Sequence, residues 1–233
     1  MARTPRRDWR PPNRARGAMC PGRGTALPIL GRVAHDPRRR DQARDDTHLR
    51  ETTVAERVVF QGSYLTFRVD TVRDPDGQER TREVVLHPGA VAIIALEGED
   101  VLLVRQWRHA TGGALLEIPA GTIDLLEDGA PEDPATCAAR ELSEETGRHA
   151  ARWTDLGAFW TAPGFTDEHM HLFLARDLSP FPGYSGPAPD ERLELVRMPW
   201  REAVAAAERG EIRDAKSIVG LLRLARLADR GEL

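Results

Sequence analysis

A carboxylate-dense stretch between Glu117 and Gly147 constrains this chain more than any other part of its sequence. Asp133 followed by Pro134 predicts the start of a helix, because an aspartate caps free backbone N–H groups and proline fits the first helical position. Gly147 predicts the end of that helix, since glycine readily adopts the left-handed conformation of a C-cap. The residues between them predict an amphipathic helix with an apolar stripe. The stripe consists of Ala135, Ala138 and Leu142.

The neighbouring face of this helix carries Glu141, Glu144 and Glu145 at positions i, i+3 and i+4. Like charges at this spacing repel, so a cation is needed to compensate them. Arg140 stands four residues before Glu144 and is expected to pair with it. Glu141 and Glu145 then remain, one turn apart, as oxygen ligands for a hard divalent cation.

The acidic helix resembles the Nudix box, G-x5-E-x7-R-E-U-x-E-E-x-G-U, in which U is an apolar residue. Residues 140–147 match its segment R-E-U-x-E-E-x-G, and Glu132 precedes Arg140 by the required seven intervening residues. The chain departs from the box in having ten residues between Gly121 and Glu132, which predicts an inserted loop. Glu127 has the box spacing from Gly121 but not to Arg140, so Glu132 is the preferred box glutamate.

Other segments resemble the ADP-ribose pyrophosphatase branch of this family, namely residues 82–91, 106–108, 117–121, 163–168 and 210–216. This resemblance implies an α/β fold, a Nudix-type α/β/α sandwich with a mixed sheet. It also implies a homodimer in which the N-terminal strands contribute to the partner's site. The order of strands and helices along the chain independently suggests a mixed sheet covered by helices.

Three segments are expected along the chain. Residues 1–50 contain 13 Arg, five Asp and no Glu, and they lack a periodic apolar pattern, so they are predicted to be a disordered extension without a catalytic role. An arginine-rich arm can also bind nucleic acid.

Residues 51–87 are predicted to form a small antiparallel β element, with a core too small to be stable alone. It should pack on the main domain, on a partner subunit or on both. Residues 88–233 are expected to form the Nudix hydrolase domain.

Hydrophobic patterning predicts the individual elements. Alternation over residues 65–71 indicates a half-buried strand whose apolar face carries Leu65, Phe67, Val69 and Thr71, with a return strand over 79–86. The nearly continuous apolar run 90–96 indicates a strand buried on both faces. Further strands are expected at 101–104, 153–160, 170–175 and 192–198, and helices at 200–208 and 214–229.

Metal chemistry follows from the acidic helix. Cleavage of a diphosphate requires neutralisation of the charge on its oxygens, and a carboxylate-bound Mg²⁺ supplies this. Glu141 and Glu145 are the preferred ligands and Glu144 is the next candidate, while Mn²⁺ is an alternative metal. The resemblance adds the backbone carbonyl of Ala120 as a ligand. It also makes Arg140 and Glu144 part of the catalytic set.

The remaining site residues come from the resemblance and from side-chain chemistry. Glu168 matches the loop glutamate that acts as general base in the similar enzymes, with Asp167 adjacent to it. Arg82 and Arg108 are candidates for binding phosphate or the terminal ribose, because a guanidinium offers two parallel donors. Glu83 and Glu117 are expected to bind ribose hydroxyls or to pair with those arginines. The aromatic side chain that stacks on adenine is left open among Phe60, Tyr64 and Trp107.

The acidic helix predicts Mg²⁺-dependent hydrolysis of a nucleoside diphosphate derivative. The resemblance implies that this derivative is ADP-ribose, which would give AMP and ribose 5-phosphate. One alternative is another Nudix substrate, such as NADH, a nucleotide sugar or a nucleoside triphosphate. A second alternative is a non-catalytic ADP-ribose sensor, but the intact set of carboxylates argues against a sensor. The expected partners are a small nucleotide and a second copy of the chain, rather than a membrane or nucleic acid. No run of eighteen apolar residues exists, so no transmembrane helix is predicted. Two cysteines form no disulfide framework and favour a cytoplasmic location. The histidines, including His87, His169 and His171, are expected to have no role as ligands.

Overall fold

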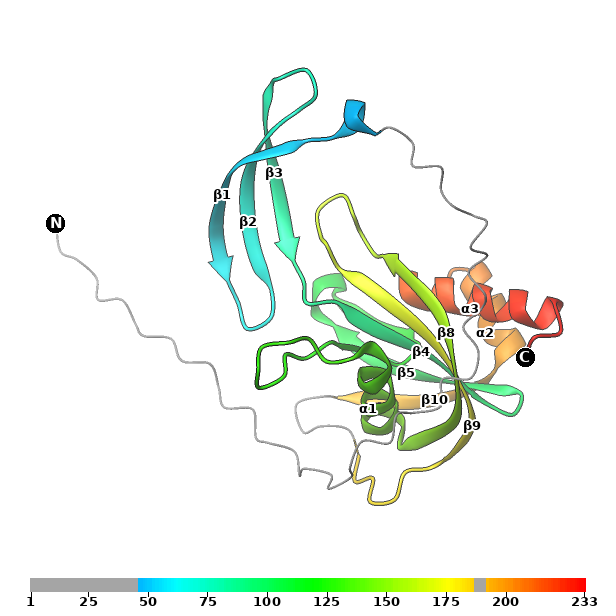
Figure 1. Cartoon of the computed structure of the whole chain (residues 1–233). Helices are drawn as coiled ribbons and strands as arrows, with labels where there is room; N and C mark the ends of the chain where they lie inside the picture. The colour runs from blue at the N-terminus through cyan, green and yellow to red at the C-terminus, as the bar shows by residue number, and fades with distance from the viewer. Residues whose placement is uncertain (1–45, 187–191) are drawn as a thin grey trace.

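The computed structural model describes residues 46–186 and 192–233, so most of the predicted extension, residues 1–45, lies outside the described residues. Two separate β-sheets organise the described chain (Figure 1). The first is antiparallel, has the order β1-β2-β3, and follows a short 3-10 helix, η1 (Thr47–Leu49). Its strands are β1 (Thr52–Gln61), β2 (Thr66–Arg73) and β3 (Glu79–Leu86). The small antiparallel element predicted before the main sheet is therefore confirmed.

The larger sheet contains seven strands, five of them in the order β10-β5-β4-β9-β8, with β6 paired to β5 and β7 paired to β4. Its strands are β4 (Ala90–Glu97), β5 (Asp100–Arg108), β6 (Gly113–Glu117), β7 (Ala120–Thr122), β8 (Arg148–Trp160), β9 (His169–Pro180) and β10 (Leu193–Pro199). The helices are η2 (His109–Thr111), α1 (Pro134–Thr146), α2 (Trp200–Glu208) and α3 (Ala215–Asp229).

Strand β4 lies at the centre of the molecule and is buried on both faces, as its apolar run predicts. Ile93 belongs to the core layer beneath α1, whereas Ile94 belongs to the layer beneath α2 and α3. The helices thus cover opposite faces of the sheet (Figure 1). Because β4 is parallel to β9 and antiparallel to β5 and β7, the sheet is mixed, and the predicted α/β/α sandwich is confirmed.

The neighbouring strands β4 and β5 separate along their length, and the segment between β6 and β7 lies between them. They pair only where residues 95–97 meet residues 100–102, at the end of β4. The beginning of β4 pairs instead with β7, and the Ile93 N–H donates to the Pro119 carbonyl at 2.8 Å. The segment between β6 and β7 is thereby inserted into the middle of the sheet, close to α1.

The small sheet differs from the prediction in one respect. The two buried residues of β2 are Asp70 and Val72, on the face opposite to the predicted apolar face of Phe67 and Val69. Asp70 pairs with Arg68 at 2.8 Å, and this ion pair lies on the buried face. So little of the sheet is covered by the described residues that alternation alone does not decide which face is inside.

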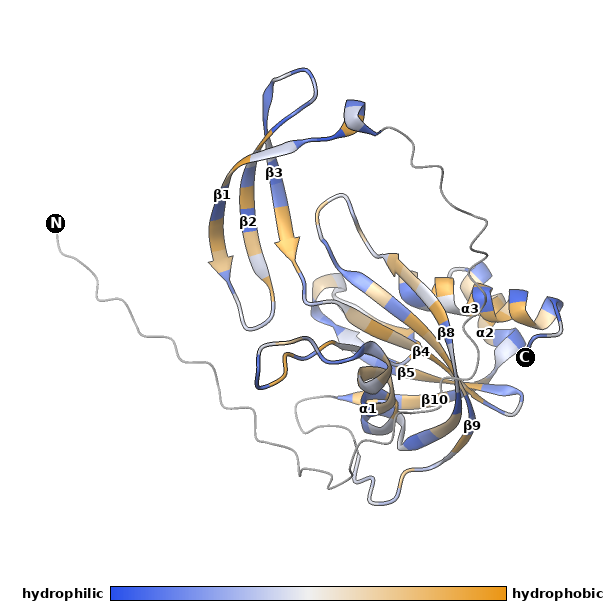
Figure 2. Cartoon of the chain, in the orientation of Figure 1, coloured by the Kyte–Doolittle hydropathy of each residue, from blue (hydrophilic) through white to orange (hydrophobic). Residues whose placement is uncertain are grey.

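Strand β1 is exposed along its whole length. Its apolar side chains are accessible, and Phe60 retains 64% of its surface. Figure 2 shows hydrophobic segments at the ends of β1 and β3. Within the described ranges, no helix combines the length and the apolar character needed to cross a bilayer.

Candidate active site

Helix α1 is positioned by the local signals that its sequence contains. Asp133 accepts the backbone N–H of Thr136 at 3.0 Å, Pro134 is the first helical residue, and Gly147 closes the helix with φ of 64°. Of the apolar stripe, Ala138 and Leu142 are fully buried against the sheet, and Ala135 is partly buried beside them. The predicted helix and both of its caps are thus confirmed, and the helix presents its glutamates beside the core.

Two of these glutamates pack against the start of β7, at Ala120 and Gly121. Glu141 and Glu145 retain only 8% and 5% of their surface. The Ala120 N–H donates to Glu145 Oε2 at 3.0 Å. At Gly121 there is no room for a side chain, because a Cβ there would lie 1.9 Å from the Glu141 carboxyl carbon. A larger residue at Gly121 would therefore displace the Glu141 carboxylate from its position in this structure.

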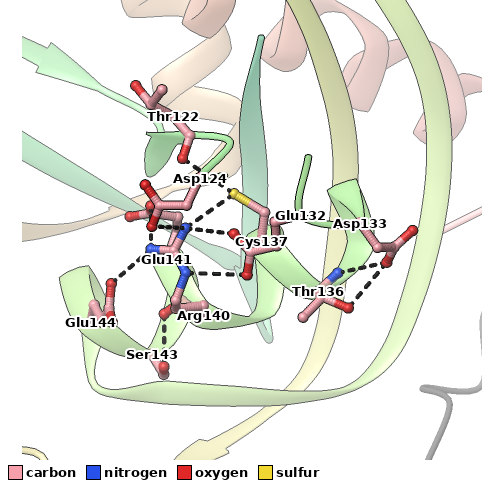
Figure 3. A network of polar contacts seen from close by, with 10 residues as sticks. All are labelled: Thr122, Asp124, Glu132, Asp133, Thr136, Cys137, Arg140, Glu141, Ser143 and Glu144. Carbon is pink, nitrogen blue, oxygen red and sulfur yellow. Dashed lines mark hydrogen bonds and ion pairs between the residues drawn. The ribbon is translucent and has the colours of Figure 1, made fainter. Parts of the chain in front are cut away.

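Arg140 connects the acidic residues (Figure 3). It donates to Glu132 at 2.9 and 3.3 Å, to Glu141 at 2.7 Å and to Glu144 at 3.1 Å. Partial burial alone would lower the pKa of Arg140, but the neighbouring Glu132 and Glu141 carboxylates raise it above its ordinary value. Arg140 therefore remains charged throughout the accessible pH range.

This network corrects one expectation and bears on the choice of the box glutamate. Arg140 was expected to pair with Glu144 alone and to leave Glu141 and Glu145 free, but it also binds Glu141, and Glu145 accepts from the backbone. The reason is that Arg140 extends across the helix face toward Glu132. Glu132 is buried beside it, whereas Glu127 is exposed in the inserted loop, which favours Glu132 as the box glutamate.

The donor set at α1 suits a hard cation. Glu141 and Glu145 offer two buried carboxylates beside the backbone of Ala120, and oxygen ligands of this kind are the ones that Mg²⁺ and Mn²⁺ bind. Within residues 46–186 and 192–233, no three acidic, histidine or cysteine side chains already converge on a single point. A cation would therefore require these carboxylates to move closer together than they are in this structure.

A second charged cluster lies at the end of β6. Arg108 makes two hydrogen bonds of 2.7 Å to Glu117, which is 1% exposed, and Lys216 of α3 also pairs with Glu117. Burial by itself would raise the pKa of Glu117, but Arg108 and Lys216 hold it below its ordinary value. The pairing of Glu117 with Arg108, one of two roles expected for it, is thus present in the structure.

Lys216 was not predicted as a site residue. It lies in the 210–216 segment that resembles the enzyme family, and it bridges Glu117 to Asp214, which caps α3. Ser217, next to it, accepts the Ile118 N–H at 2.8 Å. Helix α3 therefore supports the segment between β6 and β7 from the face opposite to α1.

Glu168 lies in the loop between β8 and β9, and both of its carboxylate oxygens have neighbours. Thr161 donates its hydroxyl to Oε2 at 2.6 Å, and the His87 ring nitrogen Nε2 lies 3.6 Å from Oε1. The adjacent Asp167 accepts the backbone N–H of His87 at 2.7 Å. His87, which was expected to have no role as a ligand, contacts the loop that carries the predicted base.

Arg82 and Glu83 lie on β3 in the small sheet, and both are exposed. The hydrogen bonds of Arg82 go to Glu51 and to the Thr81 carbonyl. The structure therefore does not bring Arg82 into contact with the Arg108–Glu117 pair within one chain. The three candidate stacking residues, Phe60, Tyr64 and Trp107, are all exposed.

Comparisons with known proteins agree with this arrangement. Residues 85–219 match the family model described as NUDIX domain, and residues 51–85 match the nucleoside diphosphate sugar hydrolase N-terminal domain. An ADP-ribose pyrophosphatase of Bacillus subtilis (strain 168) is 39% identical over 170 residues, covering 72% of this chain and 89% of that protein. A GDP-mannose pyrophosphatase of Cronobacter sakazakii (strain ATCC BAA-894) is 33% identical, covering 66% of this chain and 82% of that protein.

A solved structure described as an ADP compounds hydrolase is similar with a TM-score of 0.67 and 24% identity, covering 79% of this chain and 98% of that chain. At that identity it supports the fold alone. Together, the fold and the site define an α/β/α sandwich with a buried carboxylate cluster on its first long helix. The chain belongs to the Nudix family and is a Nudix hydrolase.

Proposed function

We propose that this protein hydrolyses ADP-ribose to AMP and ribose 5-phosphate in a Mg²⁺-dependent reaction. The observation that carries the proposal is the pair of buried carboxylates, Glu141 and Glu145, held against the backbone of Ala120 and Gly121. The similarity to an ADP-ribose pyrophosphatase over most of both chains supports the choice of substrate.

In this proposal, Glu141 and Glu145 hold the metal, with Glu144 and the Ala120 carbonyl as further oxygen donors. The bound metal would supply positive charge to the non-bridging diphosphate oxygens and thereby stabilise the transition state. Mn²⁺ is a chemically similar replacement. Arg140 orients Glu141 and Glu144 through its hydrogen bonds to both.

Glu168 is proposed as the general base. It would accept a proton from the water that attacks one phosphorus atom, while the bridging P–O bond breaks and the second phosphate leaves with its sugar. The Thr161 hydroxyl already donates to one of its oxygens, which leaves the other oxygen available for the water. Exposure of a quarter of the Glu168 side chain is compatible with access of substrate.

Substrate binding is proposed to involve Arg108 and Arg82 with Glu117 and Glu83. The exposed fraction of Arg108 is large enough for a further contact beyond its pair with Glu117. Arg82 and Glu83 lie on the small sheet and are exposed, so their contribution requires a second copy. A homodimer formed through the small sheet would cover the apolar side chains of β1 and bring β3 near the partner's site.

A nucleotide sugar is the second candidate substrate. Two observations favour it, namely the match of residues 51–85 to the N-terminal domain of nucleoside diphosphate sugar hydrolases and the similarity to a GDP-mannose pyrophosphatase. Because the cleaved linkage is the same, the catalytic residues would not change.

The proposed location is the reducing cytoplasm. Cys137 is buried and forms no disulfide, and burial raises the pKa of its thiol, which is compatible with that location.

The test is a hydrolysis panel with Mg²⁺ or Mn²⁺ in which AMP, GMP and sugar phosphates are quantified. The panel contains ADP-ribose, GDP-mannose, NADH and nucleoside triphosphates. Release of AMP from ADP-ribose, with the highest kcat/KM of the panel, supports the proposal. A kcat/KM for GDP-mannose above that for ADP-ribose would indicate that nucleotide sugars are the substrates. Binding of ADP-ribose without turnover of any compound would indicate a sensor.

A further inference from the structure

The loop that carries Glu168 is bound to the last strand of the other sheet. The Val85 N–H donates to the Phe165 carbonyl at 2.8 Å, and the Asp167 N–H donates to the Val85 carbonyl at 3.4 Å. Val85 and Thr166 form a parallel bridge. The end of β3 therefore acts as a short additional strand beside this loop, although the two segments are far apart in sequence.

His87, which follows β3, contacts this loop twice. Its backbone N–H donates to Asp167 Oδ1 at 2.7 Å, and its ring nitrogen Nε2 lies 3.6 Å from Glu168 Oε1. The ring is held in place by the Gly89 N–H, which donates to Nδ1 at 3.0 Å, and by the edge of Tyr64 at a centroid distance of 6.0 Å.

The hydrogen bond from Gly89 determines where the ring proton lies. Because Nδ1 accepts this hydrogen bond, it holds a lone pair, and the proton of the neutral imidazole resides on Nε2. That N–H group faces the Glu168 carboxylate. A neutral His87 therefore presents a donor to Oε1 without the need for a second proton.

The length of this contact suits a group that orients a base without neutralising it. At 3.6 Å the distance from Nε2 to Oε1 exceeds a hydrogen bond, whereas Thr161 makes a full hydrogen bond to Oε2. The lone pairs of Oε1 consequently remain available to a water molecule, while the Thr161 hydrogen bond on Oε2 and the imidazole ring beside Oε1 together limit rotation of the carboxylate. Carboxylates in active sites commonly depend on such neighbours for their orientation.

We propose that His87 is a positioning residue that orients the Glu168 carboxylate and couples it to the end of the small sheet. The inference rests on the proposed function, since it assigns Glu168 the role of base. His87 lies outside the acidic helix, and its contact with Glu168 would set the orientation of the carboxylate toward the attacking water.

The test is a double-mutant cycle on the full chain, with turnover of ADP-ribose as the readout. His87→Phe retains a ring beside Tyr64 but removes the donor, and it should lower kcat about tenfold with little change in KM. His87→Gln, whose amide can donate from a position near Nε2, should recover most of that loss. In the Glu168→Gln background, His87→Phe should cause no further loss, because the two residues act as one unit.

His149→Phe is the matched control. Like His87, His149 contacts an aromatic ring edge-on, in this case that of Phe181, but it lies at the end of β8 that is remote from the Glu168 loop. It should leave kcat unchanged. Equal losses from His87→Phe in both backgrounds, or a failure of His87→Gln to restore kcat, would overturn the proposal.

A second readout does not depend on turnover. Amide hydrogen exchange at residues 165–168 should be faster in His87→Phe than in the wild type or in His149→Phe. Unchanged exchange would contradict the positioning role whatever the activity. If the wild type hydrolyses nothing while exchange responds as expected, the proposed function fails and the link between His87 and the loop stands.

Discussion

The carboxylate of Glu145 accepts a hydrogen bond from the backbone N–H of Ala120 at 3.0 Å, across the interface between α1 and the sheet. This contact joins the acidic helix to the strand that separates β4 from β5. It holds the carboxylate against Ala120, whose carbonyl is itself a candidate ligand. The position of the proposed metal is thus defined by backbone as well as by side chains.

Glu145→Gln should abolish most turnover without unfolding the protein. The amide oxygen of glutamine can still accept from Ala120, but the negative charge for the cation is lost, so kcat should fall by about a hundredfold or more. Turnover with Mg²⁺ and the thermal midpoint are measured together. Glu127→Gln, in the exposed inserted loop, is the control and should change neither. Full activity of Glu145→Gln would refute the assignment of this ligand.

Gly121→Ala should disturb the same site by steric overlap. The new Cβ would lie 1.9 Å from the Glu141 carboxyl carbon, so Glu141 has to move or the strand has to shift. We expect a loss of about 1–3 kcal/mol in the free energy of unfolding and a weaker affinity for Mn²⁺. Gly113→Ala is a matched control, because a Cβ at that position would meet no atom within 4 Å and the backbone there is not left-handed. Equal effects of the two substitutions would argue against the overlap.

The elements that local sequence encodes were predicted well. Asp133, Pro134 and Gly147 act within one turn of the helix ends, and the apolar run of β4 reports its burial directly. The short strands β6 and β7 were not predicted, because five and three residues are too few to show a period. The face of β2 was predicted wrongly because the small sheet has so little cover.

The contacts between distant segments could not be predicted from the sequence. Lys216 and Glu117 are 99 residues apart, and nothing in the local pattern of either indicates that they meet. His87 and Asp167 are 80 residues apart and meet only because β3 runs beside the β8–β9 loop. Arg82 and Glu83 remain predictions, since their proposed role depends on a second subunit.

Substitution of the exposed apolar face of β1 should change the association state. Val58 is 56% exposed although it is apolar, and burying such side chains on a second copy would stabilise a dimer. Val58→Asp should therefore shift the molar mass in solution from dimer toward monomer, as measured by light scattering after size exclusion. Thr53→Asp, at an exposed polar position of the same strand, adds the same single negative charge and is the control. A wild type that is monomeric at all concentrations would reject the proposed dimer.

The Glu117 cluster predicts a specific dependence of stability on pH. Since Arg108 and Lys216 hold the folded-state pKa of Glu117 below its unfolded value, about 4.3, the ionised carboxylate stabilises the fold above that pH. This stabilisation is lost as the pH falls through the folded-state pKa, because the carboxylate then becomes protonated in both states. Glu117→Gln removes the charge and leaves two cations without their buried partner.

At pH 7 this substitution should cost about 3 kcal/mol in the free energy of unfolding. The difference between wild type and Glu117→Gln should shrink steadily as the pH falls below about 4.3. Urea unfolding at several pH values between 7 and 3 measures this difference, and other acidic groups cancel because both proteins contain them. Glu127→Gln should show no such trend. A difference that stays constant over the whole range would mean that Glu117 stabilises the fold through packing, and the charged cluster would then have no part in its stability.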